Sequence, residues 1–282
     1  MKIVVAGGSG MLGRAFVAVA ERAGFAATAL DLPALDITRN ESLESAIPAA
    51  EWLVNCAAYT AVDRAEDEGP KALAVNATGP GNLARLCAQR GVKLLHVSTD
   101  YVFDGEAARP YREDDPPNPV SLYGRSKLEG ERAVQAAGAH AVIMRTQALF
   151  GVGGRNFVEA IAGRLERGGG ALRVVNDQFT CPTYVGHLAD AMLALMASGR
   201  AGVVHVSASG SCSWYEFACA IAAALAPGRE AVQPVPAAEY PVKARRPPCA
   251  VLDKTRYRTW TGRCMPTWQE GLAAYLAETG RA

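Results

Sequence analysis

A tyrosine and a lysine four positions apart are the first residues whose types and spacing could carry chemistry. Tyr123 and Lys127 lie in SLYGRSKLEGERA (121–133), which follows PPNP and reads as a helix. Residues four apart share one face of a helix. Tyrosine has an ordinary pKa of about 10, and a nearby ammonium group favours the phenolate and lowers that pKa. The pair therefore predicts a site where Tyr123 exchanges a proton with help from Lys127.

A hydroxyl from a second segment is expected beside this pair. Ser98 and Thr99 end the apolar run KLLHVSTD (93–100), and a neighbouring run ends in NCAAYTAVD (55–63). Open α/β sheets bind ligands at the carboxyl ends of their strands. We predict that Thr99 hydrogen-bonds a carbonyl oxygen that Tyr123 protonates, while Lys127 also holds ribose hydroxyls.

A glycine-rich loop opens the chain and admits two registers. IVVAGGSGMLGRAF reads G-x-G-x-x-G from Gly8 and G-x-x-G-x-x-G from Gly7, and the spacing alone does not choose. The loop follows an apolar strand, opens a helix, and precedes Asp31 by 18 residues counted from Gly13. This context predicts dinucleotide binding, with pyrophosphate at the helix N-terminus and an acid on the ribose. Asp31 repels a 2′-phosphate and favours NADH, although NADPH stays open.

The elements that must position these residues alternate along the first 150 positions. Strands are predicted at 2–7, 25–31, 52–58, 93–100 and 139–146, and helices at 12–23, around 80–90 and around 123–127. Continuous apolar strands separated by helices indicate βαβ units. We predict an α/β fold with a Rossmann-type doubly wound parallel sheet.

The second half of the sequence has fewer regular βαβ alternations, and its pattern predicts a smaller α/β substrate lobe. A strand is expected at 203–210, capping boxes open helices at 214–226 and 268–278, and the prolines of 227–248 mark a long irregular connection. We place the dinucleotide-binding domain at 1–152 together with about 184–208. The substrate-binding lobe takes 153–183 and 209–282.

The composition of the chain excludes several classes of binding partner and site. The chain has 282 residues, 29 basic and 28 acidic, for a net charge of +1, which argues against nucleic acid or an anionic membrane as partner. Seven cysteines without C-x-x-C spacing and four histidines without ligand spacing predict neither a disulfide framework nor a metal site. With no visible signal peptide and no apolar run long enough for a bilayer, we expect a cytoplasmic protein.

These motifs together resemble an extended short-chain dehydrogenase/reductase and, more narrowly, the dTDP-4-dehydrorhamnose reductase family over essentially the whole chain. The supporting segments are AAYTAVDRAE (57–66), NAT (76–78), STDYVFDG (98–105), YGRSKLEGE (123–131), RT (145–146), NFV (156–158), NDQFTCPT (176–183) and RRP (245–247). The resemblance favours the Gly7 register, which makes Gly8 a filler beside the pyrophosphate. It implies reduction of dTDP-4-dehydro-L-rhamnose to dTDP-L-rhamnose with NADH or NADPH, and leaves a homodimer open.

The resemblance also assigns roles by position. The catalytic residues would be Thr99, Tyr123 and Lys127. The cofactor would be bound by Gly7, Gly10, Met11, Leu12, Gly13, Asp31, Ala57, Ala58, Tyr59, Asn76, Ser98, Tyr123 and Lys127. The nucleotide-sugar would be bound by Val62, Thr99, Tyr101, Asn156, Gln178, Pro182 and Arg246, with the Arg246 guanidinium suited to a diphosphate.

Two departures from the family pattern keep alternatives open. RTQALFG (145–151) has Ala148 where the family usually has a tryptophan, and RPPCAVLD (246–253) replaces a pattern that often reads R-P-A-N-S. Loss of an aromatic removes a sugar-packing surface, so a 4-ketoreductase for another nucleotide-sugar is one alternative. A non-catalytic regulatory subunit, resembling that of methionine adenosyltransferase, is the other.

Overall fold

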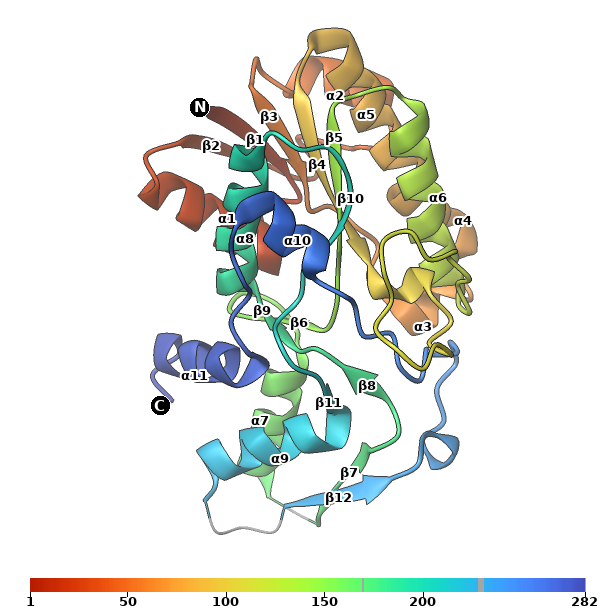
Figure 1. Cartoon of the computed structure of the whole chain (residues 1–282), viewed down its shortest axis with the longest axis vertical. Helices are drawn as coiled ribbons and strands as arrows, with labels where there is room; N and C mark the ends of the chain where they lie inside the picture. The colour runs from red at the N-terminus through yellow and green to blue at the C-terminus, as the bar shows by residue number, and fades with distance from the viewer. Residues whose placement is uncertain (169, 228–230, 282) are drawn as a thin grey trace.

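A six-stranded parallel sheet forms one end of the molecule. The computed structural model describes residues 1–168, 170–227 and 231–281. The strand order is β10-β5-β4-β3-β1-β2 (Figure 1). The strands are β1 (Lys2–Ala6), β2 (Ala26–Leu30), β3 (Trp52–Asn55), β4 (Lys93–Thr99), β5 (Ala141–Thr146) and β10 (Gly202–His205). Central strands β3 and β5 are buried along their whole length, as expected for a sheet covered on both faces. The predicted doubly wound α/β class is confirmed.

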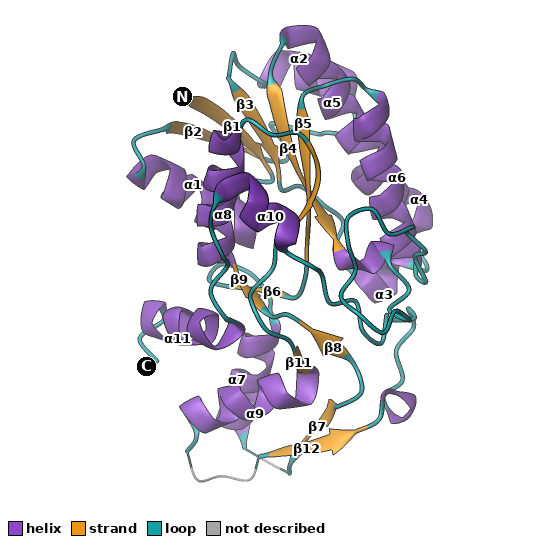
Figure 2. Ribbon diagram, in the orientation of Figure 1, coloured by secondary structure: helices purple, strands orange, loops and turns teal. Residues whose placement is uncertain are grey.

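Helices cover both faces of this sheet (Figure 2). One face carries α1 (Met11–Arg22), α8 (Val185–Ser198) and α10 (Thr255–Thr261). The other carries α2 (Asn40–Ala46), α5 (Gly79–Arg90) and α6 (Leu122–Ala136). Before α5 the chain runs through α3 (Val62–Ala65), α4 (Gly69–Leu73) and the π-helical turn η1 (Ala74–Thr78). The helices on each face therefore enclose a separate apolar core between themselves and the strands.

The other end of the molecule has a separate core. Helices α7 (Phe157–Arg167), α9 (Trp214–Leu225) and α11 (Trp268–Glu278) pack around Phe150, Phe217 and Tyr275. Three two-stranded sheets flank them: β6 (Leu149–Phe150) with β9 (Thr183–Tyr184), β7 (Leu172–Val175) with β12 (Val232–Val235), and β8 (Phe179–Thr180) with β11 (Cys212–Ser213). Short 3₁₀ turns, η2 (Asp100–Val102) and η3 (Ala237–Glu239), complete the elements.

Both predicted capping boxes are present, at Ser213 with Glu216 and at Thr267 with Glu270. The domain boundaries given above remain a prediction.

Two sequence expectations need correction, and one helix was missed. The connection 227–248 is not wholly irregular, because β12 pairs in parallel with β7; a proline is tolerated there since β12 is an edge strand. Residues 228–230 of that connection lie outside the described ranges. The strand expected at 203–210 ends at His205, and helix α8 was not singled out although alanine, leucine and methionine favour it.

Parallel pairing brings the ends of the central strands to one edge. Ala6 pairs with Asn55, Asn55 with His96, and Thr99 with Thr146. The segments that follow β1, β3, β4 and β5 therefore meet at the carboxyl edge, beside the second core. Within the described ranges, no helix has the length and apolar character that crossing a bilayer requires.

Candidate active site

The glycine loop lies tightly against the end of β3. Gly7 has φ +76°, and a Cβ atom placed on it would lie 2.4 Å from the Ala57 nitrogen. A Cβ on Gly13 would lie 2.2 Å from the Gly7 oxygen, so the first turn of α1 packs directly on the loop. This is the close backbone approach that a dinucleotide pyrophosphate needs at a helix N-terminus. The loop thus fits the cofactor that the sequence predicts.

Gly8 has a packing role instead of the filler role expected. A Cβ on Gly8 would lie 2.5 Å from the Cβ of Ala29, so this glycine lets β2 approach the loop. Asp31, at the end of β2, accepts a hydrogen bond from the Ser9 backbone nitrogen at 2.5 Å. Asp31 is thereby attached to the loop, but it does not line the cavity described next, and its contact with a ribose remains a prediction.

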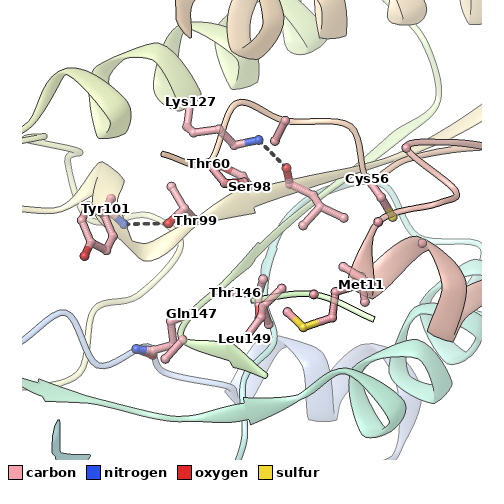
Figure 3. A pocket seen from close by; sticks show the side chains of 18 of the residues that line it. Met11, Cys56, Thr60, Ser98, Thr99, Tyr101, Lys127, Thr146, Gln147 and Leu149 are labelled. Atoms are coloured by element: carbon pink, nitrogen blue, oxygen red, sulfur yellow. Dashed lines mark hydrogen bonds between the residues drawn. The ribbon is translucent and has the colours of Figure 1, made fainter. Parts of the chain in front are cut away.

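A cavity of about 610 Å³ opens beside the loop. Gly7, Gly10, Met11, Leu12 and Gly13 line one side, and Ala58, Val62, Ser98, Thr99, Tyr101, Tyr123 and Lys127 line the remainder with residues from 146–155. Figure 3 shows Thr99 and Tyr101 opposite Thr146 and Gln147, with Lys127 and Met11 at other sides. Twelve of the site residues predicted from the sequence, from four segments, therefore surround one space.

Tyr123 begins helix α6 against the end of β4. The Ser121 hydroxyl caps the helix by accepting from the Gly124 nitrogen at 3.1 Å. Tyr123 meets Tyr101 edge to face, with ring centroids 5.5 Å apart. Burial raises the pKa of Tyr123 above its ordinary value, and the neighbouring Thr99 hydroxyl only partly opposes this rise. The lowering expected from Lys127 is not found in the chain alone, so Tyr123 is a protonated phenol at neutral pH.

Lys127 lies one helical turn further and is 2% exposed. Its Nζ donates to the Val97 carbonyl at 2.7 Å (Figure 3). Burial lowers the pKa of Lys127 to about 8, while the negative charge of Glu131 acts in the opposite direction. The negative charge of Glu131, one turn along α6, therefore helps the ammonium group to remain charged.

Glu131 belongs to a buried ion pair beneath the cavity. Its two carboxylate oxygens accept from Arg145 Nε at 2.9 Å and NH2 at 2.6 Å. The Ser98 hydroxyl donates to the same carboxylate at 2.5 Å, and Arg145 also contacts His205 Nε2 at 3.3 Å. This network ties α6 to β4, β5 and β10. Ser98 is thus occupied in structure, which leaves Thr99 as the hydroxyl beside Tyr123.

Asp100 is a further acid on the cavity wall that the sequence argument did not select. Thr99 Oγ1 donates to Asp100 Oδ1 at 3.0 Å and accepts from the Tyr101 nitrogen at 3.2 Å. Burial raises the pKa of Asp100 to about 7. A protonated Asp100 leaves the Thr99 hydroxyl proton free for a ligand carbonyl, whereas an ionised Asp100 accepts that proton.

Other predicted residues lie outside this cavity. Asn76 accepts from the Tyr59 nitrogen at 2.8 Å and donates to Ser126 at 3.0 Å, so it braces the end of β3 against α6. The Tyr59 hydroxyl donates to Glu68 at 3.0 Å. Asn156 caps α7 through the Glu159 nitrogen at 3.1 Å. Ala57, Asn156 and Pro182 line neither this cavity nor the next, and their ligand roles remain predictions.

A second cavity of about 360 Å³ adjoins the first at Tyr101. Gln178 and Arg246, both predicted for the nucleotide-sugar, line it. Arg246 is held by Asp63, with NH2 to Oδ2 at 2.8 Å and NH1 to Oδ1 at 3.0 Å. The Arg246 hydrogen bond lowers the pKa of Asp63 to about 2. The side chain of Arg246 is thus fixed across 183 residues of sequence.

Sequence reasoning missed several cavity-lining residues. The first group lies at the end of β5, where Ala148 was singled out but its neighbours Thr146, Gln147 and Leu149 were not, and the second is Gly153, Gly154 and Arg155. The end of a buried parallel strand is a signal that could have selected the first group. Cys56, Thr60 and Val97 complete the missed set together with Asp100.

Comparisons with known proteins agree with this geometry. Residues 1–281 match the family model described as the RmlD substrate binding domain. The dTDP-4-dehydrorhamnose reductase of Mycolicibacterium smegmatis is 40% identical over 279 residues, covering 98% of this chain and 85% of that protein. A probable dTDP-4,6-dihydroxy-2-methyloxan-3-one 4-ketoreductase of Streptomyces antibioticus is 41% identical over 266 residues, covering 92% and 88%.

A solved structure extends the similarity to the whole fold. The dTDP-4-dehydrorhamnose reductase of Bacillus anthracis, crystallised in complex with NADP, superposes with a TM-score of 0.92 at 34% identity, covering 98% of this chain and 99% of that one. The chain therefore belongs to the dTDP-4-dehydrorhamnose reductase family and is an NAD(P)H-dependent oxidoreductase.

Proposed function

We propose that the protein reduces dTDP-4-dehydro-L-rhamnose to dTDP-L-rhamnose, within the broader class of nucleotide-activated 4-keto-deoxysugar reductions. The observation that carries the proposal is the convergence of Thr99, Tyr123 and Lys127 on a cavity that continues from the glycine loop. The name of the M. smegmatis relative supports the choice of sugar.

In this proposal each residue has one role. Gly7, Gly10 and Gly13 hold the pyrophosphate of the cofactor, which supplies a hydride to the sugar C4 when bound. Tyr123 donates its phenolic proton to the carbonyl oxygen, so that the ketone becomes a secondary alcohol. Thr99 donates a hydrogen bond to the same oxygen, and Lys127 offsets the charge left on Tyr123. A protonated, buried Tyr123 has the form that a general acid requires in this direction.

We further propose that both NADH and NADPH are used, with NADH preferred because the Asp31 carboxylate, directly after β2, would repel a 2′-phosphate. Arg246 binds the substrate diphosphate with the donors that Asp63 leaves free. We also propose the division into a dinucleotide-binding domain and a substrate lobe, because Asp31 follows β2 of the large sheet whereas Arg246 lines the second cavity. The substrate is thereby held between the two parts.

Tyr123→Phe tests the proposal. Turnover of the 4-keto sugar, followed by NADH and NADPH oxidation, is expected to fall roughly 10²–10⁴-fold, the scale of a lost general acid. Tyr184→Phe is the matched control, because its hydroxyl donates to Glu278 away from the cavity. Unchanged turnover in Tyr123→Phe contradicts the mechanism. Cofactor binding without oxidation on any 4-keto sugar, together with altered kinetics of a partner enzyme, would support the regulatory alternative.

A second candidate is a 4-ketoreductase for another deoxysugar. Ala148 lines the cavity where the family pattern has a tryptophan, and it adopts a φ of 47°, unusual for a residue other than glycine. The S. antibioticus relative, whose name describes a different keto sugar, favours the same candidate. A panel of dTDP-, GDP-, UDP- and CDP-4-keto sugars separates the candidates, and preference for another substrate overturns the first choice.

A further inference from the structure

Two adjacent polar side chains at the end of β5 each have a polar atom without a partner in the cavity wall. Thr146 Oγ1 and Gln147 Oε1 are buried without a hydrogen bond among the described residues. Both residues line the first cavity, and Gln147 is 2% exposed. A buried acceptor without a donor is costly, and such a group in a cavity wall indicates a place where a ligand completes the hydrogen bonding.

The orientation of the Gln147 amide is fixed by its surroundings. Its Nε2 faces the Thr180 hydroxyl at 3.3 Å and the Ala250 carbonyl at 3.4 Å. A carbonyl oxygen only accepts, so the nitrogen belongs on that side. The free branch of the amide is therefore the oxygen, which requires a donor.

The neighbouring residue leaves room for a ligand at this point. Ala148 has only a methyl side chain, and the Thr183 nitrogen donates to its carbonyl at 3.0 Å, which holds the turn in place. Figure 3 places Gln147 across the cavity from Thr99 and Tyr101. A sugar whose carbonyl lies at Thr99 and Tyr123 would present its remaining ring substituents toward this opposite wall.

We propose that Gln147 is a specificity-determining residue, whose amide oxygen accepts a hydrogen bond from a ring hydroxyl of the keto sugar. The assignment rests on the proposed function, since it names the part of that substrate that this wall recognises. Thr146 completes the polar wall. Gln147 directly precedes Ala148, the position where the family usually has a tryptophan.

Gln147→Met, which keeps the length of the side chain and removes both polar atoms, tests the assignment. The parent 4-keto sugar is compared with its 2-deoxy and 3-deoxy analogues by NADPH oxidation, and sugar-nucleotide binding is measured by calorimetry. The natural chain should prefer the parent over one analogue roughly 10- to 100-fold, the range expected when a buried acceptor loses its donor. In Gln147→Met that preference should shrink to about threefold or less.

The outcomes separate this assignment from the proposed function. Gln135→Met, on the exposed face of α6, is the control and should keep the full preference. The same preference in Gln147→Met as in the natural chain overturns the assignment of Gln147 and leaves the proposed function standing. Neither reduction nor binding of any 4-keto sugar by the natural chain overturns both. Thermal melting and NADPH binding of Gln147→Met verify that the variant folds.

Discussion

Replacing Glu131 by glutamine should destabilise the fold far more than the same change two positions earlier on α6. The Glu131 and Arg145 side chains are 2% and 4% exposed, and they are joined by two hydrogen bonds. Glu131→Gln removes the negative charge and leaves a buried guanidinium without a counter-charge. Loss of one partner from such a pair costs about 3–5 kcal/mol. Because glutamine still offers one acceptor, we expect the lower end, about 3 kcal/mol.

The matched control is Glu129→Gln. Glu129 pairs with Arg132 on the solvent face, where the side chains are 43% and 60% exposed. An exposed pair of this kind contributes about 0.2–1 kcal/mol. Urea unfolding followed by far-UV circular dichroism gives the free energy of unfolding of each variant. A Glu131→Gln variant within about 1 kcal/mol of the natural chain would refute the reasoning.

The same variant should also change the titration of Lys127. Glu131 opposes the burial that lowers the pKa of Lys127 to about 8. Without that negative charge the pKa falls further, so the alkaline decline of kcat/KM should begin at a lower pH. Arg145→Met combined with Glu131→Gln should cost less than the sum of the single changes, because no unpaired charge remains. Additive costs would show that the two side chains do not act as a pair.

Two further predictions concern the cavity walls. Asp63→Asn should raise the KM for the nucleotide-sugar several-fold with little change in kcat, because the Arg246 side chain loses the carboxylate that holds it in place. Asp67→Asn is the control and should leave KM unchanged, because Asp67 forms an exposed pair with Lys243. Equal KM values for the two variants in steady-state assays would contradict this prediction. Burial raises the pKa of Asp100 to about 7 from an ordinary 3.8. Between about pH 4 and pH 7, therefore, Asp100 is protonated in the folded chain but already ionised in the unfolded chain. The free energy of unfolding falls as the pH rises through that window. Asp100→Asn should remove this fall in urea unfolding measured at pH 5 and pH 8; an unchanged difference between the two pH values would count against it.

The sequence alone predicted those parts of the site that local pattern determines. The glycine loop, the strand ends and the helical pairing of Tyr123 with Lys127 all depend on residues close in sequence, and the sheet follows from the alternation of apolar runs with helices. Contacts between segments distant in sequence could not be predicted in this way. The Asp63–Arg246 pair and the packing of Gly8 on Ala29 depend on how the chain folds back. The direction of the Tyr123 pKa likewise depends on burial, which a motif does not report.

In the proposed function, the reacting groups and the specificity-determining residues stand on different parts of the same sheet edge. Thr99, Tyr123 and Lys127 stand on β4 and α6, which the buried Ser98–Glu131–Arg145 network joins to β5. Gln147 and Ala148 come just beyond β5, where the backbone leaves the sheet. A substitution there alters the wall that faces the sugar without touching the network that positions the proton donor. This separation explains how the reacting groups can match the family pattern while the sequence after Thr146 departs from it.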